Sequence, residues 1–116
     1  MKSIKQFDIW IADLNPQRGT EPGKTRPVVI VQTNLLNKTA HPSTLICPLT
    51  TRVNTASEIL RVHLPKGQTG LTEACDILID QIRAIDNRRL TKCVGPIPEE
   101  FIPKIKENIQ IVLGLE

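Results

Sequence analysis

The chain has 116 residues, with 15 lysines and arginines against 12 aspartates and glutamates, and a formal net charge of +3. This length predicts one domain spanning residues 1–116, and the mild positive charge permits an anionic partner without requiring one. No apolar run approaches the roughly 20 residues of a membrane span, and the first residues have no apolar core of secretory type. We therefore expect a cytoplasmic protein with no membrane partner.

The cysteines and histidines do not form a metal-binding or disulfide pattern. The chain has an odd number of cysteines, Cys47, Cys75 and Cys93, and no two of them form a C-x-x-C pair. This argues against a disulfide framework and a zinc site. Each lies beside apolar residues, which predicts buried free thiols. His41 and His63 lack metal-ligand spacing. We expect no metal and no cofactor.

The first distinctive stretch is Asn15–Pro27, which carries three prolines and two glycines between two apolar runs. The flanking runs, Phe7–Leu14 and Val28–Gln32, have the composition of strands. Prolines lack the N–H that a ladder needs, so the stretch between is expected to form neither helix nor strand. A connection of this length is usually functional or disordered. Arg26 is expected at the mouth of a strand, where its guanidinium suits a phosphate; the alternative is a solvated polar loop.

The first strand is expected to have large apolar groups on both faces. Alternation puts Phe7, Ile9 and Ile11 on one face and Trp10 on the other. A strand apolar on both sides is seldom open to water. We therefore expect a helix or another subunit to cover Trp10.

After residue 32 the pattern predicts short strands and two short helical turns. The expected strands are Thr44–Leu49, Glu58–Leu64, Glu73–Ile85 and Lys92–Ile97. The expected turns are Asn34–Lys38, with Asn34 as its N-cap, and Asp86–Leu90. Pro48 inside a strand requires an edge position or a bulge, and a bulge would also explain the polar run Asp80-Gln81-x-Arg83.

Pro98–Leu113 is the one convincing helix, because its apolar residues recur at spacings of three and four. Pro103 removes a backbone hydrogen bond, so the first turn is expected to be separate and the main helix to begin near this proline. Gly114 fits the C-terminal stop. Short strands with one C-terminal helix predict a mainly β fold of the α+β class, a small antiparallel and partly closed barrel.

Three blocks of sequence together resemble one family. They are D-I-W-x-A-D-L-x-P-x-x-G-T-E-x-x-x-x-R-P-V-V-I-V-Q at Asp8–Gln32, C-P-L-T-T at Cys47–Thr51, and I-D-Q-I-R-A-I-D at Ile79–Asp86. In this order and spacing the chain is similar to the MazF/PemK toxins, which are mRNA endoribonucleases (mRNA interferases) of bacterial type II toxin–antitoxin pairs. The resemblance covers essentially the whole chain.

The resemblance implies an SH3-like, CcdB-like barrel that forms a homodimer and binds single-stranded RNA. It implies sequence-specific cleavage without a metal, in which the ribose 2′-OH attacks its own phosphate and leaves 2′,3′-cyclic phosphate and 5′-OH ends. It also implies a cognate acidic, MazE-like antitoxin that covers the RNA groove, with operator DNA bound only through the antitoxin.

The resemblance ties cleavage most closely to Arg26 and Thr50. The attack builds charge on phosphate oxygens, which Arg26 can stabilise and to which Thr50 can donate its hydroxyl. For Thr50 the alternative is a strand-end threonine bonded to nearby backbone. The general base stays open between Asp80 and Glu21, and Glu21 would equally serve to contact a base or to hold the loop through an arginine.

Further RNA contacts are expected from a group of basic and amide side chains: Arg18, Lys24, Gln81 and Arg83. For Arg83 a structural ion pair is the alternative. His41 and His63 lie outside the matching blocks and are not expected to be catalytic.

Two other functions fit the same scaffold. A CcdB-like gyrase poison would carry a C-terminal Trp-x-x-Gly-Ile-type end, whereas this chain ends I-V-L-G-L-E and its one tryptophan is Trp10. A barrel that binds nucleic acid without cutting it would use Arg26 for affinity alone.

Overall fold

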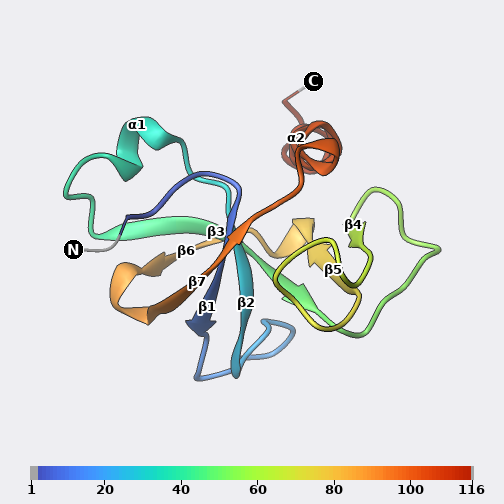
Figure 1. The fold of residues 1–116 in the computed structure, drawn as a ribbon, viewed down its shortest axis with the longest axis horizontal. Helices are drawn as coiled ribbons and strands as arrows, with labels where there is room; N and C mark the ends of the chain where they lie inside the picture. Colours follow the sequence, from blue (N-terminus) through green and yellow to red (C-terminus); the bar gives the residue numbers. More distant parts are fainter. Residues whose placement is uncertain (1–2, 116) are drawn as a thin grey trace.

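The computed structural model describes residues 3–115 and consists mainly of antiparallel strands with a C-terminal helix. The strands are β1 (Asp8–Asp13), β2 (Thr25–Ile30), β3 (Ser43–Thr50), β4 (Arg61–Leu64), β5 (Cys75–Leu78), β6 (Arg83–Asp86) and β7 (Leu90–Pro96). The helices are α1 (Asn34–Asn37) and α2 (Ile102–Leu113), with 3-10 turns at Ile79–Gln81, Asn87–Arg89 and Glu99–Phe101. The sheet order is β4-β5-β3-β2-β1-β7, and β6 pairs with β3 off this path (Figure 1). The predicted fold class is confirmed.

Strand β3 lies at the centre of the sheet and has two successive partners on one side. Its residues Ser43–Ile46 pair with β6, whereas Leu49 and Thr50 pair with β5. Pro48 lies between these two pairings, and on the opposite side it faces Val28 of β2. The proline therefore needs neither a true edge strand nor a bulge, because the sheet has a gap beside it.

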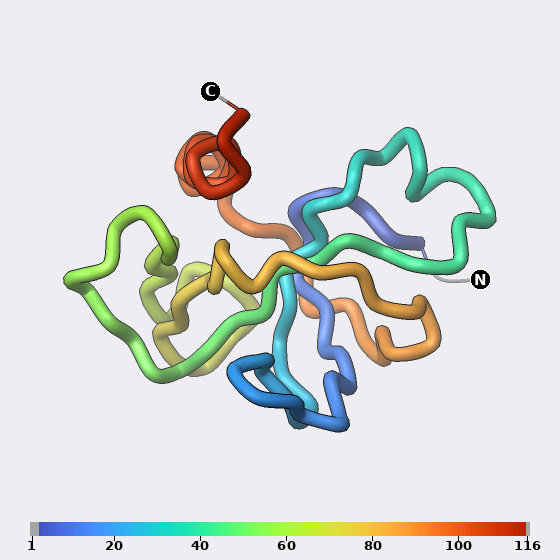
Figure 2. The backbone as a smooth tube through the Cα atoms, turned by 180° about the vertical axis from the view of Figure 1, so that it is seen from behind, coloured from blue at the N-terminus to red at the C-terminus, as the bar shows by residue number. Residues whose placement is uncertain are grey.

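The predicted long strand Glu73–Ile85 is wrong, because the structure divides it into β5 and β6. The break is the 3-10 turn Ile79–Gln81, where a bulge was expected. Both halves pair with β3 (Figure 2), and between the pairs Ile77–Leu49 and Arg83–Ile46 the chain advances six residues while β3 advances three. A β-bulge usually adds one residue to a strand, which is fewer than the three extra residues here.

Two strand boundaries also differ from expectation. Strand β2 begins at Thr25, so Arg26 and Pro27 belong to the strand and pair with Ala12 and Ile11. Pro27 is tolerated because β3 pairs with β2 only from Val28 onward, which leaves one side of the proline without a ladder partner.

The expected strand over residues 58–64 begins at Arg61, and residues 58–60 form a bend. At α1 the N-cap is Thr33 rather than Asn34, because the Thr33 hydroxyl accepts a hydrogen bond from the backbone N–H of Leu35.

The core consists of two apolar clusters on opposite faces of β1. Ile9 belongs to the cluster that includes Ile105 of α2, whereas Trp10 belongs to the other. The second cluster also contains Ala12, Leu14, Val28, Ile30, Ile46, Ile85 and Leu90. Trp10 is only 6% exposed. The expectation that a helix or another subunit covers Trp10 is therefore wrong, because strands of its own chain bury it.

Helix α2 confirms the reading of Pro103. A separate 3-10 turn, Glu99–Phe101, precedes it, and the proline falls in the first turn. Gly114 ends the helix in the left-handed conformation at φ 69°, as expected of a C-terminal stop. The fully buried Asn108 ties α2 to the chain before β4, since its amide nitrogen donates to the carbonyl of Glu58 over 2.9 Å.

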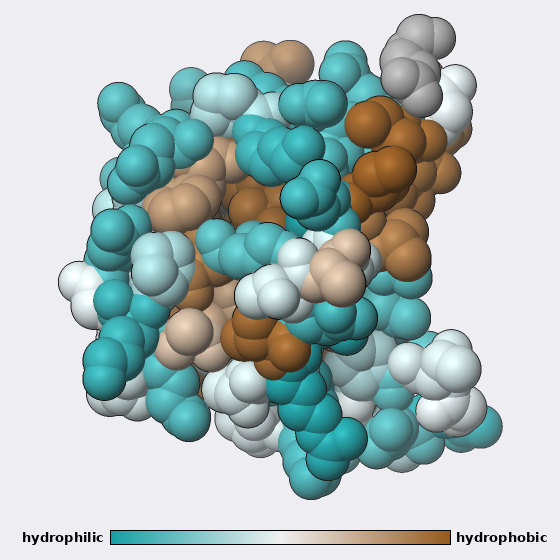
Figure 3. Space-filling view, turned by 90° about the vertical axis from the view of Figure 1, so that its right-hand side faces the viewer, coloured by the Kyte–Doolittle hydropathy of each residue, from teal (hydrophilic) through white to brown (hydrophobic). Residues whose placement is uncertain are grey.

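Apolar side chains are also exposed on the side of the molecule that carries α2 and the loop between β3 and β4. They are Val53, Ile59, Leu60 and Leu113. On this side apolar surface lies among polar surface (Figure 3). None of the helices in residues 3–115 has the length and apolar content to cross a membrane.

Candidate functional site

A cavity of about 590 Å³ opens where the loop between β1 and β2 meets the ends of β2 and β3. Its lining includes four of the residues that the sequence singled out: Glu21, Lys24, Arg26 and Thr50. The other lining residues are Gln17, Thr20, Pro22, Thr25, Pro27, Leu49, Thr51, Arg52 and Cys75. The fold therefore brings residues from separate sequence blocks into one polar hollow.

The loop between β1 and β2 is ordered and closed by backbone contacts. Leu14 donates its N–H to the carbonyl of Lys24 over 2.9 Å, and Lys24 donates its N–H to Asn15 Oδ1 over 2.8 Å. From the other side, Arg89 Nη1 donates to the carbonyls of Asp13 and Asn15. The Asn15–Pro16 peptide bond is cis. These hydrogen bonds hold the long connection in place beside the cavity.

Gly23 allows the loop to fold back on itself beside Arg26. A Cβ at this position would lie 2.4 Å from Cβ of Gln17, which is far inside contact distance. The buried glycine turns its carbonyl toward Arg26 and accepts a hydrogen bond from Nε over 2.8 Å. The close approach at Gly23 thus helps to set the direction of the guanidinium.

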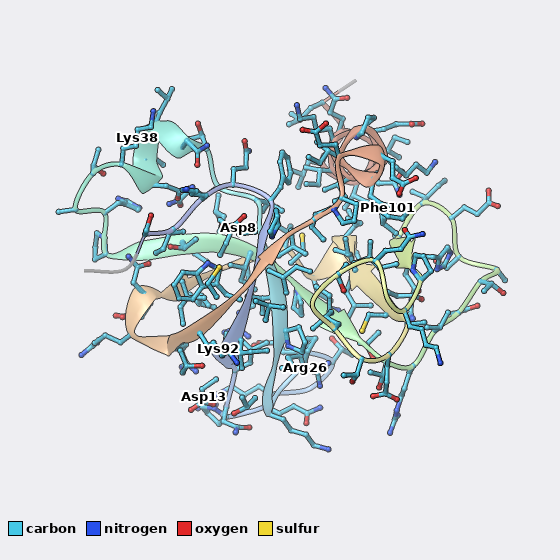
Figure 4. All side chains as sticks on the ribbon, viewed as in Figure 1. Asp8, Asp13, Arg26, Lys38, Lys92 and Phe101 are labelled. Carbon is cyan, nitrogen blue, oxygen red and sulfur yellow. The ribbon has the colours of Figure 1, made fainter. Side chains whose placement is uncertain are left out.

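Arg26 lies at the start of β2, beside the loop (Figure 4), and two backbone carbonyls fix its guanidinium. Besides the bond to Gly23, its Nη1 donates to the carbonyl of Leu49 over 3.3 Å. Burial, and then the nearby positive charge of Arg52, lower the pKa of Arg26. A guanidinium has five N–H donors and keeps its proton at neutral pH. Two guanidinium groups at one cavity therefore favour an anion between them.

Thr50 ends β3 with its hydroxyl already engaged on one side. Its Oγ1 accepts a hydrogen bond from the backbone N–H of Arg52 over 3.2 Å. This is the local backbone contact that the sequence left open as an alternative. Because the oxygen acts as acceptor in this contact, the hydroxyl hydrogen is still available to a ligand in the cavity.

Glu21 and Arg83 lie together at the margin of the cavity. Arg83 Nη1 is 3.5 Å from Glu21 Oε2, with the two side chains 28% and 48% exposed. Each had a structural ion pair among its expected roles, and the structure shows that pair. Water and salt screen charges at this exposure, so the contact orients the two side chains more than it stabilises the fold.

The remaining expected contact residues lie outside the cavity lining. Asp80 is exposed and Gln81 half-buried on the 3-10 turn before β6. Arg18 is exposed on the β1–β2 loop, where its carbonyl accepts the N–H of Glu21. His41 and His63 do not line this cavity either. Among residues 3–115, no three His, Cys, Asp or Glu side chains are grouped to hold a metal.

The sequence patterns gave no role to Asp76, which is fully buried directly beside Thr50. The two residues are Cα partners across β3 and β5. Burial alone would raise the pKa of Asp76, but hydrogen bonds from the Asn54 backbone, His63 and Arg61 outweigh it and lower the pKa. The available signal was a lone carboxylate between Cys75 and Ile77 in an apolar strand, which alternation alone assigns to a solvent face.

Comparison with known proteins gives one family over nearly the whole chain. Residues 5–113 match the family described as PemK-like, MazF-like toxin of type II toxin-antitoxin system. The chain is 32% identical over 112 residues to a protein named endoribonuclease EndoA from Bacillus subtilis (strain 168), covering 97% of this chain and 96% of that protein.

Solved structures have the same fold. MazF from Deinococcus radiodurans superposes with a TM-score of 0.82 at 22% identity, covering 98% of this chain and 99% of that one. An endoribonuclease from a mycobacterial species, solved in complex with its cognate antitoxin, superposes with a TM-score of 0.75 at 20% identity, covering 100% and 98%. A MazE–MazF structure from Deinococcus radiodurans gives a TM-score of 0.78 at 20% identity, covering all of both chains.

Proposed function

This chain belongs to the family of PemK-like, MazF-like toxins of type II toxin–antitoxin systems, and from this premise we propose that it is an endoribonuclease. Its substrate is single-stranded mRNA, which it cleaves at a preferred sequence without a metal ion. The products carry 2′,3′-cyclic phosphate and 5′-OH ends. The observation that carries the proposal is the placement of Arg26 and Thr50 in one cavity whose other charged side chains include Lys24 and Arg52.

In the reaction, the ribose 2′-oxygen forms a bond to the adjacent phosphorus and the bond to the 5′-oxygen breaks. The 2′-OH proton passes to a base, while the 5′-oxygen leaves with the electron pair of its bond to phosphorus and is protonated. Charge grows on the phosphate oxygens in the transition state. Hydrogen-bond donors held in place before the reaction stabilise that charge most effectively.

Arg26 and Thr50 supply such donors. The two backbone carbonyls that fix Arg26 hold its charge in place and use only two of its five N–H groups among residues 3–115. We assign it to charge stabilisation, because a guanidinium is a poor acid at its normal pKa. Thr50 donates its hydroxyl hydrogen to a phosphate oxygen while its oxygen accepts from Arg52.

The two carboxylates considered as proton acceptors differ in position. Glu21 lines the cavity, whereas Asp80 lies outside the lining. A general base must come within hydrogen-bond reach of the proton it removes. This supports Glu21 over Asp80, with the Arg83 contact at 3.5 Å orienting the Glu21 carboxylate.

We further propose that the chain acts as a homodimer in the cytoplasm and is held inactive by an acidic, MazE-like antitoxin. A mycobacterial endoribonuclease of this fold has been solved with its cognate antitoxin. Lys24, Arg26 and Arg52 around the cavity suit an acidic chain that competes with RNA. Operator DNA would be bound only through the antitoxin.

The test is cleavage of a long RNA of mixed sequence in EDTA, with wild type beside Arg26→Ala. Arg88→Ala is the matched control, since Arg88 is an exposed arginine paired with Asp86 away from the cavity. Wild type and Arg88→Ala should give the same discrete fragments with 5′-OH ends, and Arg26→Ala should not.

Folded, antitoxin-free wild type that leaves the RNA intact would overturn the proposal. RNA binding without cleavage would indicate a nucleic-acid-binding module. Absence of both binding and cleavage would shift attention to a gyrase-directed poison.

A further inference from the structure

We propose that Asp76 is a positioning residue whose buried carboxylate fixes the loop after β3 and thereby orients Thr50 and Arg52 at the cavity. The inference rests on the proposed ribonuclease function for its catalytic consequence. Its structural part, the fixing of the loop, stands independently of that function.

The Asp76 carboxylate is fully buried and has partners at both oxygens. Oδ2 accepts from the backbone N–H of Asn54 over 2.8 Å and from Arg61 Nη1 over 2.9 Å. Oδ1 lies 2.6 Å from His63 Nδ1. Strand β5 runs between β3 and β4, so Asp76 lies between Thr50 and His63 in the ladder. Residues directly opposite one another in a sheet point to the same face, so these three side chains form a row.

A short chain of hydrogen bonds leads from Asp76 to the cavity. Arg61 Nη1, which binds Asp76, also donates to the carbonyl of Arg52 over 2.7 Å. The N–H of the same Arg52 donates to Thr50 Oγ1. The loop is thus held at the carbonyl of residue 52 and the N–H of residue 54, on either side of Val53. Both anchors depend on the carboxylate of Asp76, directly or through Arg61.

Asp76 acts through these neighbours rather than on substrate. Neither Asp76, Arg61 nor His63 lines the 590 Å³ cavity, whereas Thr50 and Arg52 do. A misplacement of about 1 Å in a site can lower a rate by about 100-fold. The loop carries the positive charge of Arg52 and contacts the hydroxyl of Thr50 through the Arg52 N–H, so the site is sensitive to the anchors of the loop.

The strand does not need a charge at this position for packing. The neighbours Cys75 and Ile77 on β5 are buried and apolar. A buried carboxylate is expensive in free energy unless it is paired and hydrogen-bonded, and a buried ion pair is weak evidence for stability. The hydrogen bonds from Asn54, Arg61 and His63 offset the cost of burying the Asp76 carboxylate. An apolar side chain at this position would fill the strand equally well but would not fix the loop.

The experiment compares Asp76→Asn with wild type in three measurements on the full chain. Turnover is measured on a single-stranded RNA, and affinity on the same RNA carrying a 2′-deoxyribose at the cleaved position, which removes the attacking group. Amide hydrogen exchange reports the protection of Asn54. We expect kcat to fall by about 10- to 100-fold with affinity changed far less, and the Asn54 amide to lose protection.

Asp86→Asn is the matched control. Asp86 also accepts a backbone N–H, that of Arg88, and also pairs with an arginine side chain, but it lies outside the cavity lining and is partly exposed. Its kcat should equal that of wild type. Arg61→Met is the second variant. It removes the hydrogen bond to the Arg52 carbonyl, but Asp76 keeps its hydrogen bonds with His63 and Asn54. Arg61→Met should lower kcat as Asp76→Asn does. The variant with both substitutions should have a kcat only slightly lower than either single variant, because both changes break one network.

Three results would overturn the proposal. The first is unchanged kcat in folded Asp76→Asn with the Asn54 amide exposed, which would make the network purely structural. The second is full protection of Asn54 in that variant. The third, should Asp76→Asn not fold, is unchanged kcat in Arg61→Met. Wild type that cleaves no RNA would sink the ribonuclease proposal alone, because the exchange measurement still tests the positioning of the loop.

Discussion

The guanidinium of Arg26 on β2 donates a hydrogen bond to the backbone carbonyl of Leu49 on β3, one residue before Thr50. Strand β2 pairs with β3 only over Val28–Ile30, so this contact extends the connection between the two strands past their last ladder pair. The positions of Arg26 and Thr50 are therefore coupled through the backbone, and a change in one side chain is expected to affect the other.

Replacing Arg26 with lysine should abolish most cleavage although the charge is kept. A single ammonium on a flexible stem cannot reproduce a planar fork held by two carbonyls. We expect kcat to fall by about 10²- to 10³-fold, as for the loss of one preorganised donor to a developing charge. Steady-state cleavage of a defined RNA measures this, and a kcat within twofold of wild type would contradict it.

Thr50→Val should lower kcat by about 10- to 100-fold, whereas Thr50→Ser should retain most of it. Valine keeps the shape of threonine but cannot donate to a phosphate oxygen or accept from the N–H of Arg52. Serine keeps both functions, so it serves as the matched control. Equal losses in the two variants would show that the methyl group, and not the hydroxyl, matters for turnover.

Asp76 should make stability sensitive to acid. Its pKa is lowered in the folded protein, where the bonds from Asn54, His63 and Arg61 outweigh the effect of burial. The resulting stabilisation is fully present above the unfolded value of about 3.9, and it is lost as pH falls through the lower folded value. Urea unfolding of wild type and Asp76→Asn should therefore differ most above about pH 5, and the difference should shrink progressively as pH falls below about 4.

Subtraction of the two pH profiles removes the contribution of the carboxylates that both proteins share. Replacing one member of a buried ion pair destabilises by about 3–5 kcal/mol, which sets the scale of the difference expected near neutral pH. A difference that stays constant from pH 7 to pH 3 would show that the Asp76 charge contributes nothing to stability.

Among the three thiols, Cys93 should react fastest with a disulfide reagent in the native protein, because its side chain is exposed. Cys47 and Cys75 are buried, and Cys93 is exposed, which corrects the expectation that all three are buried. Burial, and then the charge of Asp80, raise the pKa of Cys47 to about 12, so its thiolate is scarce at neutral pH. Cys93→Ser should remove the fast phase, and a fast phase that survives this change would contradict the assignment.

Asn108→Ala should destabilise the protein by about 1–3 kcal/mol, because it removes the hydrogen bond that the fully buried Asn108 amide donates to the Glu58 carbonyl. Urea unfolding at pH 7 measures the change. Gln110→Ala is the control on the same helix, since that side chain is exposed. A change of less than 0.5 kcal/mol at Asn108, typical of surface substitutions, would mean that water replaces the lost amide.

Much of the fold can be predicted from the sequence wherever a single local rule determines the structure of a segment. The alternation in β1 correctly separated Ile9 from Trp10, and Pro103 and Gly114 marked both ends of α2. The division of residues 73–85 into β5 and β6 could not be predicted, because both halves have strand composition. Only the pairing of each half with a different end of β3 reveals the turn between them.

The candidate site divides in the same way. Arg26 and Thr50 were found from motifs, and the structure places them in one cavity. Asp76 was not found, since a single aspartate in an alternating strand looks like a solvent-facing residue. Its burial depends on Arg61 and His63, which lie on a neighbouring strand that the sequence does not assign to it.

The pairing of β1 with both β2 and β7 also orders events in time during synthesis. The residues of β7 that pair with β1 follow it by 78 to 88 positions, from the Ala12–Leu90 pair to the Asp8–Pro96 pair. At about 5–20 residues per second, roughly 4–18 s separate the making of the two strands. Strands β1 to β3, which carry Arg26 and Thr50, are therefore made first, while the outer edge of β1 has no partner. During that interval the nascent chain presents an open strand edge to any extended segment in its surroundings.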